Sequence, residues 1–344
     1  MSFYLEGGYL DFRAVRDLPV PFIIVVGGRG TGKTYGALEA CIEDEQFFAF
    51  MRRSQTQLDL ISKPQFSPVR RVCRDHGWKI IPAPIAKGIS GYYYYEVEEG
   101  RNKIQGSAIG INVALSTVAN VRGFDASDLD IMIFDEAIPE RGEKPLPREW
   151  DKLANCYETI NRNRELEGLP ALKLVCLANA NKQTAPILEG LRLVGTLDKM
   201  IQRGQELYMD KARGLALVLL QDSPISAAKQ DTALYRLTSG TDYAEMAIGN
   251  RFAYEDRARI GTLPLRELRP MAAVGGVTIY RHKSQRLWYV TRHKSGSPQT
   301  YGTGDMELAK FRRDLSWIYD EILSERVIFE DYAVQAELFK YINM

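Results

Sequence analysis

The sequence lacks a long apolar run, although 45% of its 344 residues are hydrophobic. A helix needs about 20 consecutive apolar residues to cross a bilayer, so we expect no membrane span. The opening segment, MSFYLEGGYLDFR, has neither the basic start nor the apolar core of a signal peptide. We therefore expect a soluble, intracellular chain without a membrane partner.

Cysteine and histidine are scarce, with four and three residues respectively. Cys41, Cys73, Cys156 and Cys176 lack the paired spacing of a zinc site, and the histidines form no cluster with them. This pattern argues against a disulfide framework or a zinc site, so we expect buried free thiols in a reducing compartment.

Neither sign of charge predominates, because the chain has 45 Lys and Arg residues and 44 Asp and Glu residues. The net charge therefore identifies no partner, and only its distribution along the chain is informative. Internal repeats and low-complexity tracts are also absent. At this length, above the usual size of one domain, we expect two domains with separate cores.

Short apolar runs rich in β-branched and aromatic residues alternate with helix-like stretches. The runs are PFIIVV, FFAFM, LDIMIF and LKLVCLA. Helices are predicted at Thr34 to Ile42 and Glu149 to Glu167. The alternation predicts an α/β fold with a mainly parallel sheet and helices on both faces.

An antiparallel hairpin interrupts this pattern in the segment GYYYYEVEEGRNKIQGSAIG. We predict its turn at Glu99 to Asn102, because Gly100 supplies the positive φ that such a turn needs. The tyrosine run allows two interpretations. It could stack on nucleic-acid bases, but a strand that packs one face and exposes the other is favoured.

The composition of the sequence changes twice after residue 221. Residues 222–249 are small, polar and helical in pattern, so we predict a linker with two short helices between residues 1–221 and 250–344. In the last segment, GGVTIYR and RLWYVTR flank a polar HKSQ turn, and an acidic amphipathic helix follows around Leu308 to Ser324. We predict a small α+β domain there.

The stretch VVGGRGTGKT matches the P-loop spacing, with a strand before it and a helix after it. Its backbone N–H groups would cradle phosphates, Lys33 would reach the β- and γ-phosphates, and Thr34 would hold Mg²⁺. The predicted fold is thus a P-loop nucleoside triphosphatase core of the ASCE (RecA-like) type that binds ATP. The nucleotide-binding residues are Gly27, Gly28, Arg29, Gly30, Thr31, Gly32, Lys33 and Thr34.

Two acids end another buried strand, in LDIMIFDEA. Asp135 would lie at the carboxyl edge of the sheet, where it can coordinate Mg²⁺, and Glu136 could activate the attacking water. Asn179 and Asn181, in LVCLANANK, would reach the same edge. Asn179 could sense the γ-phosphate, although asparagines after strands are often turn residues.

Arg162 and Arg164, in INRNREL, end a predicted helix. They could simply favour the helix dipole, or one could act as an arginine finger on a neighbouring subunit's nucleotide. Spacing alone leaves both interpretations open.

Positive charge is concentrated in two stretches that are candidates for salt-dependent contact with nucleic-acid phosphates, or else solvated surfaces. The first contains Arg52, Arg53, Lys63, Arg70, Arg71, Arg74, Lys79 and Lys87, with Asp59 and Asp75 as its only acids. The second contains Arg257, Arg259, Arg266, Arg269, Arg281, Lys283, Arg286, Arg292 and Lys294, with Glu267 as its lone acid.

These motifs together resemble the DNA-packaging ATPases, or encapsidation proteins, of small short-tailed bacteriophages of the phi-29 type. The matching segments occur in the order of that family: FIIVVGGRGTGKTYGA, FFAFMRR, IMIFDEAI, TINRNRE, LVCLANA and SGTDYAEMAIGNRF. The resemblance implies an ATPase that pumps double-stranded DNA into an empty capsid. It implies a ring, of five subunits, docked on the portal (connector) of the procapsid in the host cytoplasm. Whether a packaging RNA takes part is left open.

The resemblance also assigns residues. Lys33 and Thr34 match nucleotide-binding positions, Asp135 and Glu136 match the metal and catalytic carboxylates, and Arg162 matches the arginine finger. Arg29 is typical of the P-loops of viral packaging motors. Arg122, in STVANVRGF, lies near a basic position tied to nucleotide handling, but its surroundings differ.

Larger packaging motors carry an RNase H-like nuclease whose carboxylates bind Mg²⁺. The predicted strands of residues 250–344 carry no acid, so this domain resembles an RNase H-like fold without nuclease activity. Three other functions remain open for the chain: a helicase, a small-molecule kinase and a non-catalytic nucleotide-dependent scaffold. Glu136 beside Asp135 favours attack by water, which argues against the kinase.

Overall fold

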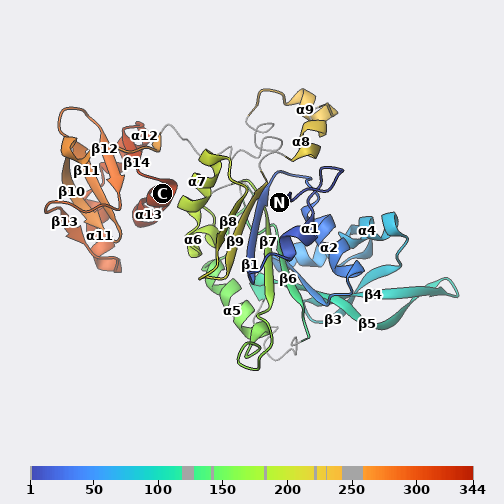
Figure 1. Ribbon diagram of the computed structural model, residues 1–344. Helices are drawn as coiled ribbons and strands as arrows, with labels where there is room; N and C mark the ends of the chain where they lie inside the picture. Colours follow the sequence, from blue (N-terminus) through green and yellow to red (C-terminus); the bar gives the residue numbers. More distant parts are fainter. Residues whose placement is uncertain are drawn as a thin grey trace. The chain divides into compact units, whose positions relative to one another are not determined.

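The computed structural model describes residues 2–117, 128–140, 143–181, 184–220, 223–229, 231–241 and 259–343. The chain divides into two compact units (Figure 1). The first comprises Met1–Gly190 and Lys199–Ala253, and the second comprises Leu191–Asp198 and Tyr254–Met344. Arg122, Arg257 and most of the segment SGTDYAEMAIGNRF lie outside the described residues.

A nine-stranded sheet forms the centre of the first unit. In sheet order, its strands are β3 (Ile80–Ala86), β4 (Ile89–Glu98), β5 (Arg101–Ala114), β2 (Phe48–Arg52), β6 (Ile131–Asp135), β7 (Lys173–Asn179), β1 (Phe22–Gly27), β9 (Leu215–Leu220) and β8 (Leu207–Asp210). The six neighbouring strands β5, β2, β6, β7, β1 and β9 are parallel to one another. At one end of the sheet β3 and β4 pair antiparallel, and at the other end β8 does so. The predicted mainly parallel α/β sheet is confirmed.

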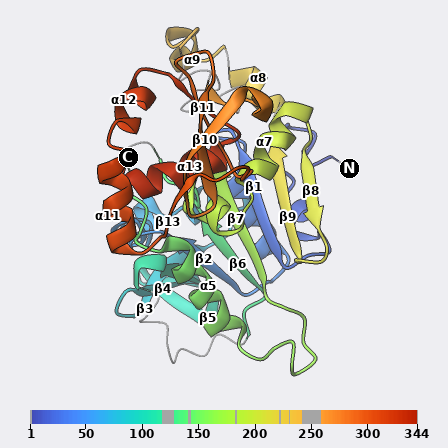
Figure 2. The ribbon, with the colours of Figure 1, turned by 90° about the vertical axis from the view of Figure 1, so that its left-hand side faces the viewer.

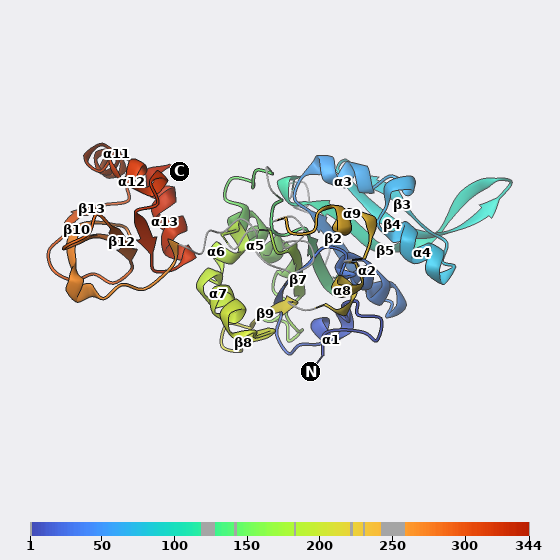
Figure 3. The ribbon, with the colours of Figure 1, turned by 90° about the horizontal axis from the view of Figure 1, so that it is seen from above.

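Helices cover both faces of this sheet, which explains why its central strands are apolar along their whole length. The helices of the first unit are α1 (Phe12–Arg16), α2 (Lys33–Glu43), α3 (Gln55–Ile61), α4 (Val69–His76), α5 (Glu149–Asn161), α6 (Pro186–Gly190), α8 (Pro224–Lys229) and α9 (Ala233–Leu237). The residues of α7 (Val194–Arg203) are divided between the two units. Side chains of α1, α2 and α4 share one core with the strands, and α5 and α6 lie on the other face (Figures 1 and 3). No helix among the described residues is both long and apolar enough to cross a bilayer. All four cysteines are buried free thiols, as predicted.

The predicted helix at Glu149 to Glu167 is too long, because α5 ends at Asn161. Arg162 has a φ of 47°, in the left-handed region that a right-handed helix cannot use. The side chain of Asn161 accepts a hydrogen bond from the backbone N–H of Leu172 (2.8 Å), which ties the end of α5 to the entry of β7.

The predicted hairpin is present as β4 and β5, and it projects from the first unit (Figures 1 and 3). Its turn residues Glu99 and Gly100 have φ values of 50° and 75°, which suits a two-residue hairpin turn. Only Tyr92 of the tyrosine run is fully buried, with its ring 5.8 Å from that of Phe48. Tyr94 is 41% exposed. The tyrosine run is therefore packed in the core at Tyr92 and partly exposed from Tyr93 onward.

The second unit is built on a five-stranded sheet covered by helices on one face (Figure 2). In sheet order the strands are β13 (Gln299–Tyr301), β10 (Leu268–Val274), β11 (Val277–His282), β12 (Trp288–Thr291) and β14 (Val327–Phe329), and the helices are α11 (Asp305–Asp314), α12 (Ile318–Leu323) and α13 (Tyr332–Ile342). The predicted hairpin is β11 and β12. The single helix predicted at Leu308 to Ser324 is wrong, because the helix is interrupted between α11 and α12. Trp317, just before α12, lies against Trp288, with 4.1 Å between the two ring centroids.

Two residues of the first basic stretch are buried ion-pair partners, so they are not available to a nucleic acid. Arg53 is 2% exposed and pairs with Glu149 (2.9 Å) and Glu143 (3.0 Å). Arg52 pairs with the two acids at the end of β6. Their burial follows from their place at the end of β2, between β5 and β6. The other basic residues of this stretch are exposed.

We expect Arg53→Ala to lower the free energy of unfolding by about 3–5 kcal/mol, because it leaves Glu149 buried without its cation. Chemical denaturation measures this change. Arg53→Met combined with Glu149→Leu should recover most of the loss, since it removes both charges. Arg70→Ala, at an exposed position, is the control. If Arg53→Ala lowered the free energy of unfolding as little as Arg70→Ala does, the stabilising role of the Arg53 ion pairs would be contradicted.

Candidate nucleotide-binding and catalytic site

The loop between β1 and α2 has the geometry of an anion cradle. Gly30 and Gly32 have φ values of 66° and 83°, which glycine adopts without strain. Gly32 is the N-cap of α2, and no side chain caps the helix there. The first N–H groups of α2 therefore remain available to a ligand, and the positive end of the helix dipole favours an anion.

Lys33 is the first residue of α2, and its side chain reaches back to the carbonyls of this loop. Its Nζ donates hydrogen bonds to the carbonyl oxygens of Gly28 (2.6 Å) and Gly27 (3.3 Å). The hydroxyl of the buried Thr31 also bonds to the Gly28 carbonyl (3.1 Å). Burial lowers the pKa of Lys33 to about 7, although the charge of Asp135 opposes this shift. Phosphate oxygens would supply the counter-charge that this buried ammonium lacks.

The carboxylate of Asp135 links the loop to β6. It is 3% exposed, and its Oδ2 accepts from Thr34 Oγ1 (2.9 Å) and pairs with the guanidinium of Arg52 (2.9 Å). Burial raises the pKa of Asp135, whereas Arg52 and Thr34 favour its charged form. A hydroxyl and a carboxylate meet here as two hard oxygen donors, the type of ligand that Mg²⁺ prefers.

Glu136 is held in a less common backbone conformation, with a φ of 56°. Such strain in non-glycine residues is concentrated at functional sites. Its carboxylate pairs with Arg52 (2.5 Å), and Arg53 donates to its backbone carbonyl (2.9 Å). Two arginines from the end of β2 thus fix both the side chain and the backbone of Glu136.

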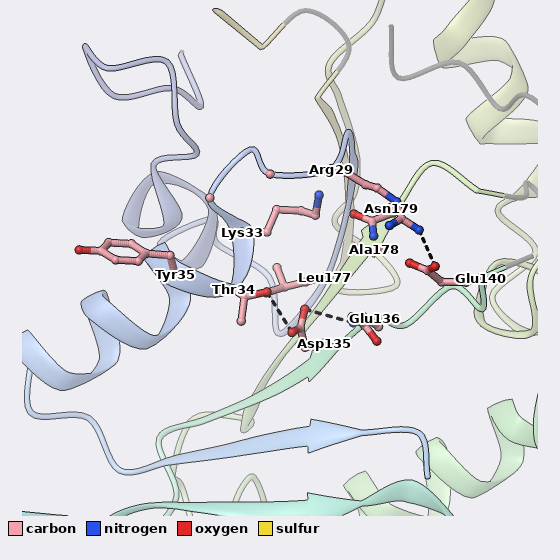
Figure 4. Close-up of a pocket in the computed structure, with 12 residues that line it drawn as sticks. Arg29, Lys33, Thr34, Tyr35, Asp135, Glu136, Glu140, Leu177, Ala178 and Asn179 are labelled. Carbon is pink, nitrogen blue, oxygen red and sulfur yellow. Dashed lines mark hydrogen bonds and ion pairs between the residues drawn. The ribbon is translucent and has the colours of Figure 1, made fainter. Parts of the chain in front are cut away.

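One cleft, of about 370 Å³, is lined by Lys33 and Thr34 on one side and by Asp135 and Glu136 on the other. Figure 4 shows these four side chains. Asn179, from the end of β7, also lines the cleft. Asn181 does not line it; it is 4% exposed, and among the described residues nothing accepts from its Nδ2. Arg29 lines the cleft and pairs with Glu140. Of the predicted residues, those that line this cleft are Arg29, Gly30, Gly32, Lys33, Thr34, Asp135, Glu136 and Asn179. Gly27, Gly28 and Thr31 are not among the residues that line it.

The two candidate arginine fingers lie elsewhere. Arg162 is exposed at the end of α5 and is not among the described residues that line the cleft. Arg164 donates to the backbone carbonyls of Leu129 (3.0 Å) and Pro170 (3.2 Å). Arg164 thus has a structural role, which leaves Arg162 as the candidate for a neighbouring site.

Sequence reasoning assigned Arg52 to a basic surface and missed its place in the site. Its neighbours are set by strand order, since β2 pairs with β6 although 78 residues separate Arg52 from Ile131 at the start of β6. The signal in the sequence was weak: an arginine directly after a buried strand, at the edge where ligands bind. Glu140, four residues after Glu136, gave no signal.

Comparison with known proteins identifies the family of this chain and several relatives. The family profile described as Podovirus DNA encapsidation protein (Gp16) matches residues 19–262. The DNA packaging proteins of Bacillus phages PZA and phi29 are each 28% identical to this chain over 234 residues, which is 66% of this chain. The match covers 61% of the length of those relatives.

Solved structures share the fold over almost the whole chain. The bacteriophage Phi-29 viral genome packaging motor assembly contains a chain with a TM-score of 0.65 and 18% identity, with 99% of this chain and 100% of that chain covered. The Phi-28 gp11 DNA packaging motor gives a TM-score of 0.63 and 16% identity, with 98% of both chains covered. At these identities the likeness concerns the fold.

We expect Lys33→Ala to weaken ATP binding by about 10- to 100-fold, because charge-assisted hydrogen bonds to phosphate are among the strong ones. Titration calorimetry measures the change. Lys211→Ala, at an exposed position, is the control. Equal affinity of the Lys33→Ala and wild-type proteins for ATP would show that the loop is not the phosphate site.

Proposed function

This chain belongs to the Podovirus DNA encapsidation protein (Gp16) family, and we propose that it is an ATPase that couples ATP hydrolysis to the movement of double-stranded DNA into an empty capsid. One observation carries the proposal: Glu136 and the buried Asp135 face the phosphate loop across a single cleft. Such a pair supports hydrolysis, because one carboxylate can serve a metal and the other can activate water.

We assign nucleotide binding to the loop from Gly27 to Thr34. Lys33 would exchange its carbonyl partners for phosphate oxygens, and the N–H groups at the start of α2 would donate to the β-phosphate. Thr34 and Asp135 would hold Mg²⁺. Bound there, the ion would neutralise charge on the phosphates as it develops.

Hydrolysis requires a water in line with the γ-phosphate. Glu136 is the general base, and Arg52 positions its carboxylate. Asn179 lines the cleft and detects the loss of the γ-phosphate through a hydrogen bond. Arg162 is exposed and does not line the cleft of its own subunit. It reaches the nucleotide of a neighbouring subunit, so that ATP hydrolysis in one subunit depends on the next.

This mechanism requires a ring, and we propose a ring of five subunits. Its partners are double-stranded DNA and the portal of the procapsid, on which the ring docks in the host cytoplasm. A packaging RNA is a further candidate partner. A structural neighbour supports the assembly part of this proposal, since it is a chain of the bacteriophage Phi-29 viral genome packaging motor assembly.

DNA contact is supported by exposed basic residues on both units. On the first unit, α4 carries Arg70, Arg71 and Arg74. On the second, Arg269 and Arg281 lie opposite each other on β10 and β11 and are both exposed. Like charges directly opposite on adjacent strands are unfavourable. A polyanion would relieve this repulsion, and binding of this kind is independent of sequence.

We propose that residues 250–344 form an RNase H-like domain without nuclease activity, joined by residues 222–249 to the nucleotide-binding residues 1–221. Among the described residues, no cluster of three acids, histidines or cysteines suits a metal ion. The strands β11 and β12 carry no acid. The domain would therefore grip DNA or the portal without cutting.

Steady-state ATP hydrolysis, with and without long double-stranded DNA, tests the proposed function. We expect duplex to stimulate turnover, and the stimulation to fade from low to moderate salt because counterion release drives the binding. Glu136→Gln should bind ATP with unchanged affinity and fail to turn over. Turnover that stays indifferent to DNA even with procapsids added, or equal loss of ATP binding in Glu136→Gln and Lys33→Ala, would contradict the assignment.

Mixed subunits test the role of Arg162. Neither Arg162→Ala nor Lys33→Ala alone should hydrolyse ATP at an appreciable rate. When the two are mixed, an intact Lys33 site next to an intact Arg162 restores part of the turnover. The rate is measured across mixing ratios, and an absence of rescue at every ratio would place Arg162 in its own subunit's site.

A further inference from the structure

The last residue of the short helix α8, Lys229, contacts the loop that we assign to phosphate. At its start, Ser223 Oγ donates to the carbonyl of Gly8 (2.9 Å), and a Cβ at Gly8 would lie 2.7 Å from the backbone nitrogen of Ile225. At its end, Lys229 Nζ donates to the carbonyl of Arg29 (2.6 Å). A Cβ at Gly30 would overlap that same Nζ. The helix therefore contacts the segment around Gly8 at its start and the β1–α2 loop through Lys229 at its end.

The bond from Lys229 acts on one peptide unit of the loop. The Arg29 carbonyl and the Gly30 N–H belong to the same planar trans peptide, so they point in opposite directions. Gly30 lines the cleft. A cation on the carbonyl holds the orientation of the N–H and polarises it, which strengthens its donation to an anion.

Lys229 also adds charge to the site. Among the described residues, no carboxylate forms an ion pair with Lys229, and its partner is a neutral carbonyl. A bound phosphate would relieve the repulsion among Arg29, Lys33 and Lys229.

We propose that Lys229 is a positioning residue of the nucleotide site: it holds the Arg29–Gly30 peptide as a phosphate donor, and it ties α8 to the occupancy of that site. This inference rests on the proposed nucleotide binding. Phosphate contact with the Gly30 N–H would strengthen the bond between Lys229 and the Arg29 carbonyl through the same peptide. Nucleotide binding therefore stabilises α8, and loss of nucleotide loosens it.

The test compares three variants of the full chain: Lys229→Met, Lys229→Arg and Lys211→Met. Lys229→Met removes the donor and keeps an unbranched side chain, whereas Lys229→Arg retains a cationic donor. Lys211, exposed between β8 and β9, is the matched control. ADP affinity is measured by calorimetry, and amide hydrogen exchange is measured at residues 28–32 and 223–229 with and without ADP.

We expect Lys229→Met to weaken ADP binding by about tenfold. Lys229→Arg and Lys211→Met should stay within about threefold of wild type. In wild type, ADP should slow amide exchange in α8 as well as in the loop, and Lys229→Met should keep part of the loop response and lose that of α8.

Two results would overturn the proposal. One is a lower melting temperature of Lys229→Met with unchanged ADP affinity, which would mean that Lys229 only stabilises the fold. The other is an α8 response to ADP that persists in Lys229→Met. Failure of the proposed function is distinguishable, because the wild-type protein would then bind no nucleotide at all.

Discussion

The buried carboxylate of Asp135 is the group on which the rest of the site depends. A charge removed from water is costly unless it is paired and hydrogen-bonded. Thr34 and Arg52 both meet this need on a single oxygen, Oδ2, while the backbone N–H of Glu136 donates to Oδ1 (3.1 Å). This one side chain therefore joins α2, β2 and the turn after β6, and it links the β1–α2 loop to the backbone of Glu136, the proposed general base.

Sequence reasoning succeeded where a residue's place follows from its own strand. Parallel strands bring their carboxyl ends to one edge, so the loop after β1, Asp135 at the end of β6 and Asn179 at the end of β7 could be placed together from the sequence. The register bears this out, because Gly27 lies opposite Asn179 and β7 pairs with both β1 and β6. Local turn chemistry likewise predicted the hairpin, with its turn at Glu99 to Asn102, and the structure has the turn at Glu99 and Gly100.

Sequence reasoning failed where a residue's surroundings come from a distant strand or from tertiary packing. Arg52 and Arg53 look like surface charge in the sequence, and only the pairing of β2 with β6 shows that they hold the carboxylates. The contact of Lys229 with the phosphate loop spans 200 residues, so no local pattern could reveal it. The interruption of the helix near Trp317 likewise accompanies a contact with the ring of Trp288, from β12, that local sequence does not reveal.

A structure of the chain bound to ADP, Mg²⁺ and a fluoride analogue of the γ-phosphate would test the central claim most directly. The account predicts that Lys33 leaves the Gly28 carbonyl for phosphate oxygens, that Thr34 and Asp135 contact the metal ion, and that Glu136 contacts the water in line with the analogue. A nucleotide bound away from the β1–α2 loop, or Lys33 still bonded to the carbonyls of Gly27 and Gly28, would contradict it.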